Sequence, residues 1–337
     1  GGGVVHRAIR LLPVDVSEAI ERECHAVELN LGTDSLRFTT RRDDPIISMT
    51  MRDEFDFLLI SAAKEAEADI RSECKVLDVI VGADKLELVT SEGPLFARFV
   101  VAADGAMGTM AMKTGWQETR HLIPALECEA FVSDGLLEKL GPTARFDFGV
   151  VPFGYAWIFP KKGHLSAGVL SMRRGSVNLN SLLEGYMKLN GLDKIVRTKR
   201  HGFLIPVSPR KDGFVRGRVL LTGDAAGLAD PITGEGITFA VLSGQIAAKA
   251  LLDGAFDEAR VKVLYESELL RKILPELRLG RALAKLTYDY PRLLRRLFKL
   301  YGQEFTEAVT DVVMGKKTYR ELFSNPMNYL KFFRKWY

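Results

Sequence analysis

Cysteine and histidine are both scarce in this chain. Its 337 residues include three cysteines and five histidines, and neither set has the spacing of a metal site or a catalytic cluster. A disulfide-stapled scaffold and a zinc module are therefore excluded. The thiols are expected to be reduced and buried in a cytoplasmic protein, at Cys24, Cys74 and Cys128.

Long apolar runs and a strong charge of one sign are also missing. No stretch approaches the roughly 18–20 apolar residues of a transmembrane helix, and no signal peptide is visible. The net charge of +4 is too small to indicate a nucleic-acid-binding protein. The composition, 47% hydrophobic and 27% charged, is typical of a globular chain with one large domain or two closely associated ones.

The periodicity of the apolar residues predicts a mixed α/β (α+β) fold. A helix is expected over 52–70, and period-two alternation between 125 and 170 predicts antiparallel strands. From residue 235 onward the pattern is mainly helical. We therefore expect α/β outer parts with a β-rich insertion between them.

The segment from Arg218 to Ile237 has the most informative pattern. An apolar strand ends in Gly223-Asp224, a glycine-rich loop follows, and a helix begins after Gly236. A helix N-terminus can hold an anion, and glycines let the backbone approach a ligand closely. Asp224 is placed to accept hydrogen bonds from sugar or ribityl hydroxyls. An ordinary strand–loop–helix turn is the alternative, but the full pattern G-D-A-A-G-x-x-x-P-x-x-G-E-G-I favours flavin binding.

This motif resembles the second flavin-contacting motif of the p-hydroxybenzoate-hydroxylase-like flavoproteins. Its continuation over 237–248 is similar to the geranylgeranyl reductase family in particular. Three further segments resemble that family: the glycine run 1–3, the M-R-D-E-F-D segment 51–56, and P-F-G-Y-A-W-I-F-P-K at 152–161. The last matches the family's P-x-x-Y-x-W-x-F-P signature. Together these segments span the chain as far as about residue 250.

The resemblance implies FAD as the cofactor, held by a Rossmann-like domain. It implies flavin contacts at Gly1, Gly2, Gly3, Arg52, Val76, Asp104, Gly223, Asp224, Pro231, Gly234, Gly236 and Ile237. Val76 is equally well explained as a core residue. The Asp104-Gly105 motif departs from the wider flavoprotein pattern, because Gly108 and Ala111 stand where a serine and an arginine often follow. That departure weighs against a preformed site for a second nucleotide.

The N-terminal end lacks what the family begins with, a strand, a G-x-G-x-x-G turn and a helix. We expect a first βαβ unit of about 40–50 residues to precede Gly1 in the full protein. The chain itself is predicted to form a discontinuous FAD-binding domain over 1–120 and 200–255. A β-rich substrate domain over 121–199 and a helical C-terminal region over 256–337 complete the prediction.

Tyr155, Trp157 and Phe159 alternate, so a strand would put all three on one face. Such a row is commonly plain core, but with the resemblance it is interpreted as the substrate-binding wall of a tunnel for an isoprenoid chain. The resemblance implies a reductase that saturates C=C bonds of a geranylgeranyl or polyprenyl lipid. The flavin carries the hard chemistry, and Tyr155 is the candidate catalytic residue, as proton donor. NADPH or a ferredoxin is the expected electron source.

The C-terminal part is basic. Residues 281–337 hold 12 Lys/Arg against 5 Asp/Glu, and apolar residues recur at helical spacing over 291–301. This pattern favours a cytoplasmic protein in peripheral contact with the inner face of a membrane. Packing on the protein's own core, or a solvated helical face, is the alternative. A polyprenyl lipid and a ferredoxin are the expected partners, and nucleic acid is not.

Two other functions stay open at this point. The Gly-Asp motif is shared with FAD-dependent monooxygenases and halogenases that act on aromatic substrates. A lipid-binding relic without flavin is the other, non-enzymatic possibility. The P-x-x-Y-x-W-x-F-P segment favours the reductase over the monooxygenases and halogenases.

Overall fold

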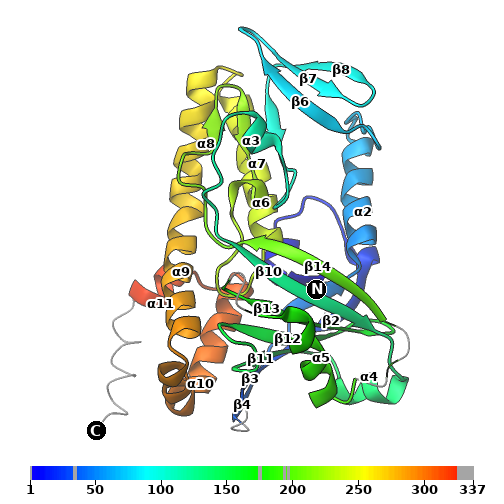
Figure 1. The fold of residues 1–337 in the computed structure, drawn as a ribbon. Coiled ribbons are helices and arrows are strands. Elements are labelled where there is room, and N and C mark those ends of the chain that lie inside the picture. The colour runs from blue at the N-terminus through cyan, green and yellow to red at the C-terminus, as the bar shows by residue number, and fades with distance from the viewer. Residues whose placement is uncertain (1, 33–35, 174–176, 193–194, 196–197, 325–337) are drawn as a thin grey trace. The chain divides into compact units, whose positions relative to one another are not determined.

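The computed structural model describes residues 2–32, 36–173, 177–192, 195 and 198–324 (Figure 1). Its contacts divide the chain into two compact units. The first comprises the described residues of 1–62, 123–203 and 282–337, and the second comprises 63–122 and 204–281. Helices and strands are mixed in both, so the predicted mixed α/β fold is confirmed. Each unit is described below by itself.

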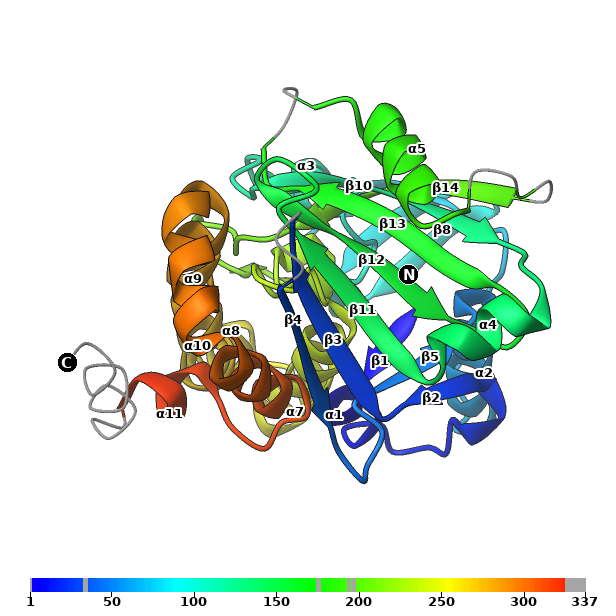
Figure 2. The ribbon, with the colours of Figure 1, turned by 90° about the horizontal axis from the view of Figure 1, so that it is seen from below.

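The first unit is built around a seven-stranded sheet of order β14–β10–β13–β12–β11–β3–β4. Its strands are β3 (Ala26–Leu31), β4 (Leu36–Arg41), β10 (Leu122–Ala130), β11 (Thr143–Phe148), β12 (Gly154–Pro160), β13 (Leu165–Ser171) and β14 (Thr198–Pro206). Strands β10, β13, β12 and β11 pair antiparallel in succession and lie side by side in Figure 2, whereas β11 pairs with β3 in parallel.

The two faces of β12 differ because its side chains alternate. Ala156 and Ile158 belong to a buried cluster with residues of α5 (Leu179–Leu189), among them Leu183. Tyr155 and Trp157 point to the opposite face and are also buried. The sheet is therefore covered on both sides, and α10 (Pro291–Val313) contacts β3 and β4 at its far edge.

Smaller elements complete the first unit. A three-stranded sheet has the order β1–β5–β2, from β1 (Gly3–Val5), β2 (Ile20–Cys24) and β5 (Ile47–Thr50). The helices are α1 (His6–Ile9), the 3₁₀ turn η1 (Ser17–Ala19), most of α2 (Arg52–Glu65), α4 (Asp134–Leu140) and α11 (Tyr319–Ser324). Helix α10 is kinked at Tyr301, whose φ of −139° and ψ of 21° are not helical.

The second unit combines two three-stranded sheets with long helices. One sheet has the order β15–β16–β9, from β9 (Val100–Ala102), β15 (Val215–Arg216) and β16 (Val219–Leu221). The other is an antiparallel meander of β6 (Val76–Val81), β7 (Leu86–Thr90) and β8 (Gly93–Ala97). The helices are α3 (Met110–Lys113), α6 (Gly223–Ala226), α7 (Ile237–Asp253), α8 (Glu258–Lys272) and the first half of α9 (Leu274–Asp289).

Strand β16 runs parallel to β9 and is buried along its whole length. Its apolar run Val219–Leu221 joins a core that includes Phe239 and Ile246 of α7 and Tyr265 of α8. A buried parallel strand followed by a helix is the local arrangement that nucleotide-binding folds use. The core of the second unit thus fixes the strand end at which the Gly223-Asp224 motif begins.

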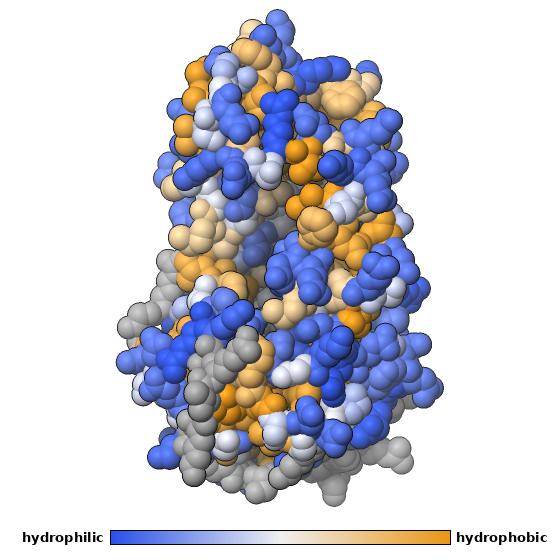
Figure 3. Space-filling view, turned by 90° about the vertical axis from the view of Figure 1, so that its right-hand side faces the viewer, coloured by the Kyte–Doolittle hydropathy of each residue, from blue (hydrophilic) through white to orange (hydrophobic). Residues whose placement is uncertain are grey.

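The surface carries no membrane-spanning segment among the described residues. None of their helices is long and apolar enough to cross a bilayer. On the face drawn in Figure 3, apolar patches are separated by polar ones. Of the predicted buried thiols, Cys24 and Cys128 are buried, but Cys74 is half-exposed, so the expectation for Cys74 is wrong. Cys74 precedes β6, a strand with few buried side chains.

Candidate functional site

The Gly223-Asp224 motif forms the connection from β16 to α6 in the second unit. Thr222, which follows the strand, is extended, and Gly223, the first residue of the short helix α6, takes a left-handed φ of 49°. Such a φ strains any residue with a side chain, which explains glycine at this position. The N–H of Gly223 donates to Oγ of Ser243 on α7, at 2.9 Å. The motif is thereby tied to the long helix that follows it.

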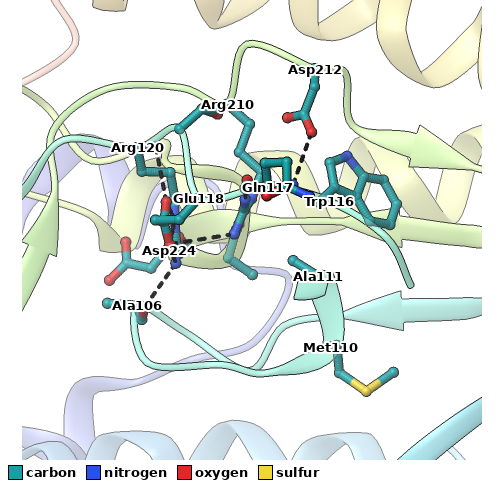
Figure 4. Close-up of polar contacts among 12 residues, drawn as sticks. Ala106, Met110, Ala111, Trp116, Gln117, Glu118, Arg120, Arg210, Asp212 and Asp224 are labelled. Atoms are coloured by element: carbon teal, nitrogen blue, oxygen red, sulfur yellow. Dashed lines mark hydrogen bonds and ion pairs between the residues drawn. The ribbon is translucent and has the colours of Figure 1, made fainter. Parts of the chain in front are cut away.

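Two buried arginines bind the carbonyl groups of this motif (Figure 4). Arg120 donates from Nη1 to the main-chain oxygen of Asp224, at 2.7 Å, and from Nη2 to that of Ala106, at 3.0 Å. Arg210 donates from Nε to the main-chain oxygen of Ala225, at 2.8 Å. The side chains are only 3% and 1% exposed. Charge-assisted bonds in such surroundings hold a backbone rigidly.

Glu118 supplies the negative charge that these two cations need. Its carboxylate accepts from Arg120 at 2.6 Å and lies 3.9 Å from Arg210. The hydrogen bond from Arg120 lowers the pKa of Glu118 to about 2. Burial lowers the pKa of Arg210, and the neighbouring Arg120 charge adds to that effect. Arg120, Arg210 and Glu118, called the arginine clamp below, thus form one electrostatic unit around the motif.

The carboxylate of Asp224 lies beside the start of α7. A Cβ on Gly236 would come within 3.1 Å of Oδ1 of Asp224, so glycine there permits the helix N-terminus to approach the carboxylate. One amide of that terminus is already used, because Glu235 Oε1 accepts from the N–H of Thr238 at 2.6 Å. Pro231 and Gly234 lie in the preceding loop, which Asp230 closes by accepting from the N–H groups of Ile232 and Thr233.

These contacts fit a dinucleotide cofactor in their chemistry. A strand end, a glycine-bounded carboxylate and a helix N-terminus are the groups that accept ribose hydroxyls and attract phosphate. The approach of Gly236 to Asp224 is the observation that supports the fit, because a larger residue would separate the two. Ile237, the first residue of α7, stands at the same end. The role of each residue remains a prediction.

Asp104 and Val76 are the other predicted contacts in the second unit. The Asp104 carboxylate accepts from the N–H of Met110 at 2.9 Å and so caps the short helix α3. Gly108 is required beside it, because a Cβ there would overlap the carboxylate. Val76 begins β6 and packs against the core of the unit. Both residues therefore have structural roles that account for them without a ligand.

The remaining predicted cofactor residues belong to the first unit. Gly1 lies outside the described residues. Gly2 accepts from the N–H of Thr50 at 2.8 Å, and Gly3 begins β1. Arg52 is exposed at the start of α2 and forms an ion pair with Asp56 one turn along that helix, at 2.9 Å. These residues and the Asp224 motif belong to different units.

The aromatic row of the prediction forms as expected on one face of β12. Trp157 lies between Tyr155 and Phe159, with ring centroids 6.1 Å from each. Phe146 and Phe148 on β11 add edge and tilted contacts to Tyr155. Gly168 on β13 is the partner of Trp157, and a Cβ there would lie 2.0 Å from the indole ring. The indole therefore covers a position that only glycine leaves open.

A buried polar cluster borders this row. Trp157 Nε1 donates to Ser166 Oγ at 3.3 Å, and Ser166 Oγ donates to Glu127 Oε2 at 3.1 Å. Lys161, 3% exposed, donates from Nζ to the main-chain oxygen of Thr50 at 2.7 Å. Burial lowers the pKa of Lys161. Charged side chains are rarely buried unless they are paired or take part in binding or catalysis. This cluster is therefore a candidate for function as well as for structure.

Comparison with known proteins identifies relatives of the chain, although no established family profile matches it. Digeranylgeranylglycerophospholipid reductase 2 of Methanothermobacter thermautotrophicus is 31% identical over 239 residues, which are 66% of this chain and 60% of the relative. The chain is a homologue of the geranylgeranyl reductases. The chain matches 60% of the length of the Methanothermobacter reductase, which is less than two thirds. Other relatives are named geranylgeranyl diphosphate reductases.

Solved structures agree on the fold. A geranylgeranyl bacteriochlorophyll reductase-like protein from Thermoplasma acidophilum superposes with a TM-score of 0.73 at 21% identity, over 85% of this chain and 76% of that one. Klebsiella pneumoniae HpxO, complexed with FAD and uric acid, gives 0.68 at 15% identity, over 93% and 87%. At these identities the likeness concerns the fold alone. That fold is the FAD-binding one which the sequence motifs of a geranylgeranyl reductase predict.

Several residues of this geranylgeranyl reductase homologue escaped prediction. Arg120 and Arg210 are isolated in the sequence, and only the folded chain brings them to the Asp224 motif. Lys161 stands directly after the P-x-x-Y-x-W-x-F-P signature. A lysine next to an apolar strand was a signal for a buried charge. Glu127 alternates with the apolar Leu126 and Cys128, so the period assigns it to the polar face of the strand, yet β10 is buried on both faces there.

Proposed function

We propose that the chain acts in an FAD-dependent reductase that saturates C=C double bonds of a geranylgeranyl or other polyprenyl lipid. The observation that carries the proposal is the aromatic row of β12. It holds the rings of the P-x-x-Y-x-W-x-F-P signature together on one buried face, in a homologue of the geranylgeranyl reductases. An apolar, ring-lined wall suits a prenyl chain, since apolar burial contributes about 25 cal/mol per Å².

In this proposal the Asp224 motif binds the cofactor. Asp224 accepts hydrogen bonds from hydroxyls of the sugar or ribityl part, and the N-terminus of α7 attracts the diphosphate. Bound FAD, once reduced, supplies a hydride to the substrate. The arginine clamp does not touch the cofactor in this proposal. It keeps the carbonyl groups of Asp224 and Ala225 fixed, and with them the direction of the carboxylate.

On the substrate side, Tyr155 is proposed as the proton donor and, with Trp157 and Phe159, as part of the chain-binding wall. The phenol is buried, so it is shielded from bulk water. Exclusion of water protects a reduced flavin from side reactions. An isolated alkene accepts a hydride poorly, so close positioning is the main contribution required of the protein. NADPH or a ferredoxin is proposed as the source of electrons.

A flavin titration tests the proposal. The protein, purified with bound FAD and reduced anaerobically by dithionite, is mixed with a geranylgeranyl lipid. We expect the oxidised flavin spectrum to return and the lipid to gain one pair of hydrogens for each bond reduced. A fully saturated phytanyl lipid is the matched control and should leave the flavin reduced. Failure of every prenyl lipid to reoxidise the flavin would contradict the proposal.

Monooxygenase or halogenase chemistry on an aromatic substrate is a second reading of the same fold. Its support is the likeness to HpxO and to the brominase Bmp2, at 15% and 17% identity, which concerns the fold alone. Oxygen uptake with NADPH and an aromatic substrate distinguishes the two. A protein that is purified without any bound flavin would instead favour the lipid-binding alternative.

A peripheral membrane position is proposed for the basic C-terminal helices. The amphipathic residues of α10 include exposed Arg292, Arg295 and Lys299. The aromatic segment 325–337 lies outside the described residues. Cations and apolar residues on one helix are typical of interfacial helices. In α10, however, Leu294 and Phe298 are buried within the first unit, so packing accounts for part of the pattern.

A further inference from the structure

A cavity of about 270 Å³ lies within the first unit, beside the start of α10. Its walls are mainly apolar and come from β3, β11, the loop before β12, the end of α9 and the start of α10: Leu31, Phe148, Val151, Phe153, Tyr288 and Leu294. Small-molecule sites usually measure about 300–1,000 Å³. The cavity thus suits a short stretch of a longer apolar chain better than a whole ligand.

The mouth of the cavity is cationic. Arg292 and Arg295, one turn apart on α10, line it and are exposed. A third cation, Arg173, lies with its guanidinium 3.5 Å from the ring centroid of Phe153. The nearby acid Asp289 is 4.0 Å from Arg173. Among the described lining residues, apolar walls are therefore combined with two arginines that face solvent.

Phe153 adds an independent sign of a ligand site. Its φ of 55° places a bulky residue in the left-handed region that favours glycine. Strained backbone of this kind persists where its surroundings over-determine it, and it concentrates at ligand-binding positions. Phe153 forms part of the cavity wall, and its ring also contacts the guanidinium of Arg173.

One wall of the cavity adjoins the aromatic row. Phe148 lines it, and the same ring lies 5.7 Å from the ring of Tyr155 and 6.3 Å from that of Tyr288. Gly154, another lining residue, directly precedes Tyr155. Phe148 thus belongs both to the cavity wall and to the ring contacts of the P-x-x-Y-x-W-x-F-P segment.

We propose that this cavity binds the phosphate-bearing end of a prenyl amphiphile. The phosphate lies at Arg292 and Arg295, and the first isoprene units lie against Phe148, Tyr288 and Leu294. Guanidinium groups bind phosphate through paired hydrogen bonds, whereas the apolar walls select a hydrocarbon. The inference deepens the proposed function, on which it rests, by locating the head-group end of the substrate.

Equilibrium binding tests this site without any turnover. The probes are geranylgeranyl diphosphate and the uncharged alcohol geranylgeraniol, titrated by calorimetry into the wild type and into the double variant Arg292→Gln, Arg295→Gln. We expect the double variant to bind the diphosphate at least tenfold more weakly and the alcohol unchanged. Arg296→Gln is the matched control, since Arg296 is exposed on the same helix and does not line the cavity.

Two further arms sharpen the result. Raising salt should weaken binding of the diphosphate by the wild type but not binding of the alcohol, because exposed charges are screened. A digeranylgeranylglyceryl phosphate presented in vesicles, compared with the soluble diphosphate, identifies whether the phosphate comes from a lipid or from a free prenyl ester. Weaker binding of either phosphate-bearing probe by the double variant, with binding of the alcohol unchanged, supports the site.

The site is wrong if the double variant binds the diphosphate like the wild type, or if Arg296→Gln weakens it equally. This outcome is separable from failure of the proposed function. If prenyl lipids reoxidise the flavin but the double variant binds the diphosphate like the wild type, the reductase proposal stands and the proposed site is wrong. Arginine-dependent binding with a flavin that no prenyl lipid reoxidises leaves the site and removes the reductase.

Discussion

Glu118 is the titratable member of the arginine clamp that responds to acid. Arg120 binds its carboxylate at 2.6 Å and lowers its pKa from the ordinary 4.5 to about 2. A lowered pKa in the folded state means that the stabilisation is complete above pH 4.5 and is lost as the pH falls toward 2. Acid should therefore loosen the clamp on Asp224 before it unfolds the core.

We predict that Glu118→Gln flattens this acid dependence. The melting temperature of the wild type should fall progressively between pH 4.5 and pH 2. The variant should have a lower melting temperature at pH 4.5 and a smaller decrease over that range. The loss should be modest, since Glu118 is 39% exposed and exposed ion pairs contribute little. Differential scanning calorimetry across the range measures it. Glu258→Gln is the control, because Glu258 is 42% exposed in its pair with Arg218. An equal slope for wild type and Glu118→Gln would contradict the prediction.

Among the secondary-structure elements, the pairing of β12 with β13 depends on a glycine, Gly168, that leaves room for a ring. Trp157 lies over Gly168, and a Cβ at Gly168 would come within 2.0 Å of the indole. The same indole holds Ser166 and, through it, Glu127. A methyl group at Gly168 therefore displaces both the aromatic row and the buried polar cluster.

We predict that Gly168→Ala lowers the free energy of unfolding by about 1–3 kcal/mol, the usual cost of overpacking. Urea titration measures the loss, and tryptophan fluorescence should report a changed environment for Trp157. Gly163→Ala is the matched control, because a Cβ there meets nothing within 4 Å in the connection between the same strands. Equal stability of Gly168→Ala and the wild type would show that the ring moves aside freely.

Elements with a clear apolar period were predictable from the sequence. The alternation of Tyr155, Trp157 and Phe159 gave the strand and its face, and the unbroken run from Ile237 gave α7. Strand β11 was not predicted, although its residues alternate between polar and apolar, with Arg145 and Asp147 at polar positions. In the fold those two groups pair, at 2.9 Å, and Tyr186 donates to Asp147. The bond from Tyr186 joins residues 39 positions apart, and a contact of that separation leaves no local trace in a sequence.

The candidate site was readable only where its residues are contiguous. The Gly223-Asp224 loop and the β12 signature are local patterns, and both form the turns and faces that the patterns imply. The expected helix over 52–70 ends at Glu65, since Glu67 adopts a left-handed φ of 66°. Arg120 and Lys161 act through main-chain oxygens of distant segments. Nothing in residue spacing predicts a hydrogen bond to a remote carbonyl.

Binding of the cofactor should raise the thermal stability of the whole molecule. A ligand that binds only the folded chain stabilises it, by about 2.7 kcal/mol at a concentration of one hundred times its dissociation constant. We predict that FAD raises the melting temperature of the wild type and that Asp224→Asn reduces the rise, with at least tenfold weaker FAD binding. Thermal shift with added FAD measures both. Asp212→Asn, in the pair with Arg216 of the same unit, is the control.

Riboflavin, which lacks the diphosphate and adenosine, serves as a second ligand in that experiment. If it stabilised the wild type as much as FAD does, the α7 terminus would have no part in binding. An undiminished FAD effect in Asp224→Asn would remove the carboxylate from the cofactor site. Either result would leave the fold, and the homology, intact.

The arginine clamp joins Arg120 to Asp224 across 104 residues of chain. During synthesis from the N-terminus, Arg120 emerges long before its acceptor, and no local contact can substitute for it. Closing so large a loop costs entropy that only the completed core repays. The nascent polypeptide should therefore form the Asp224 turn late, after α7 has left the ribosome. Chaperone dependence should consequently be governed by this second half of the chain rather than by the sheet of the first unit.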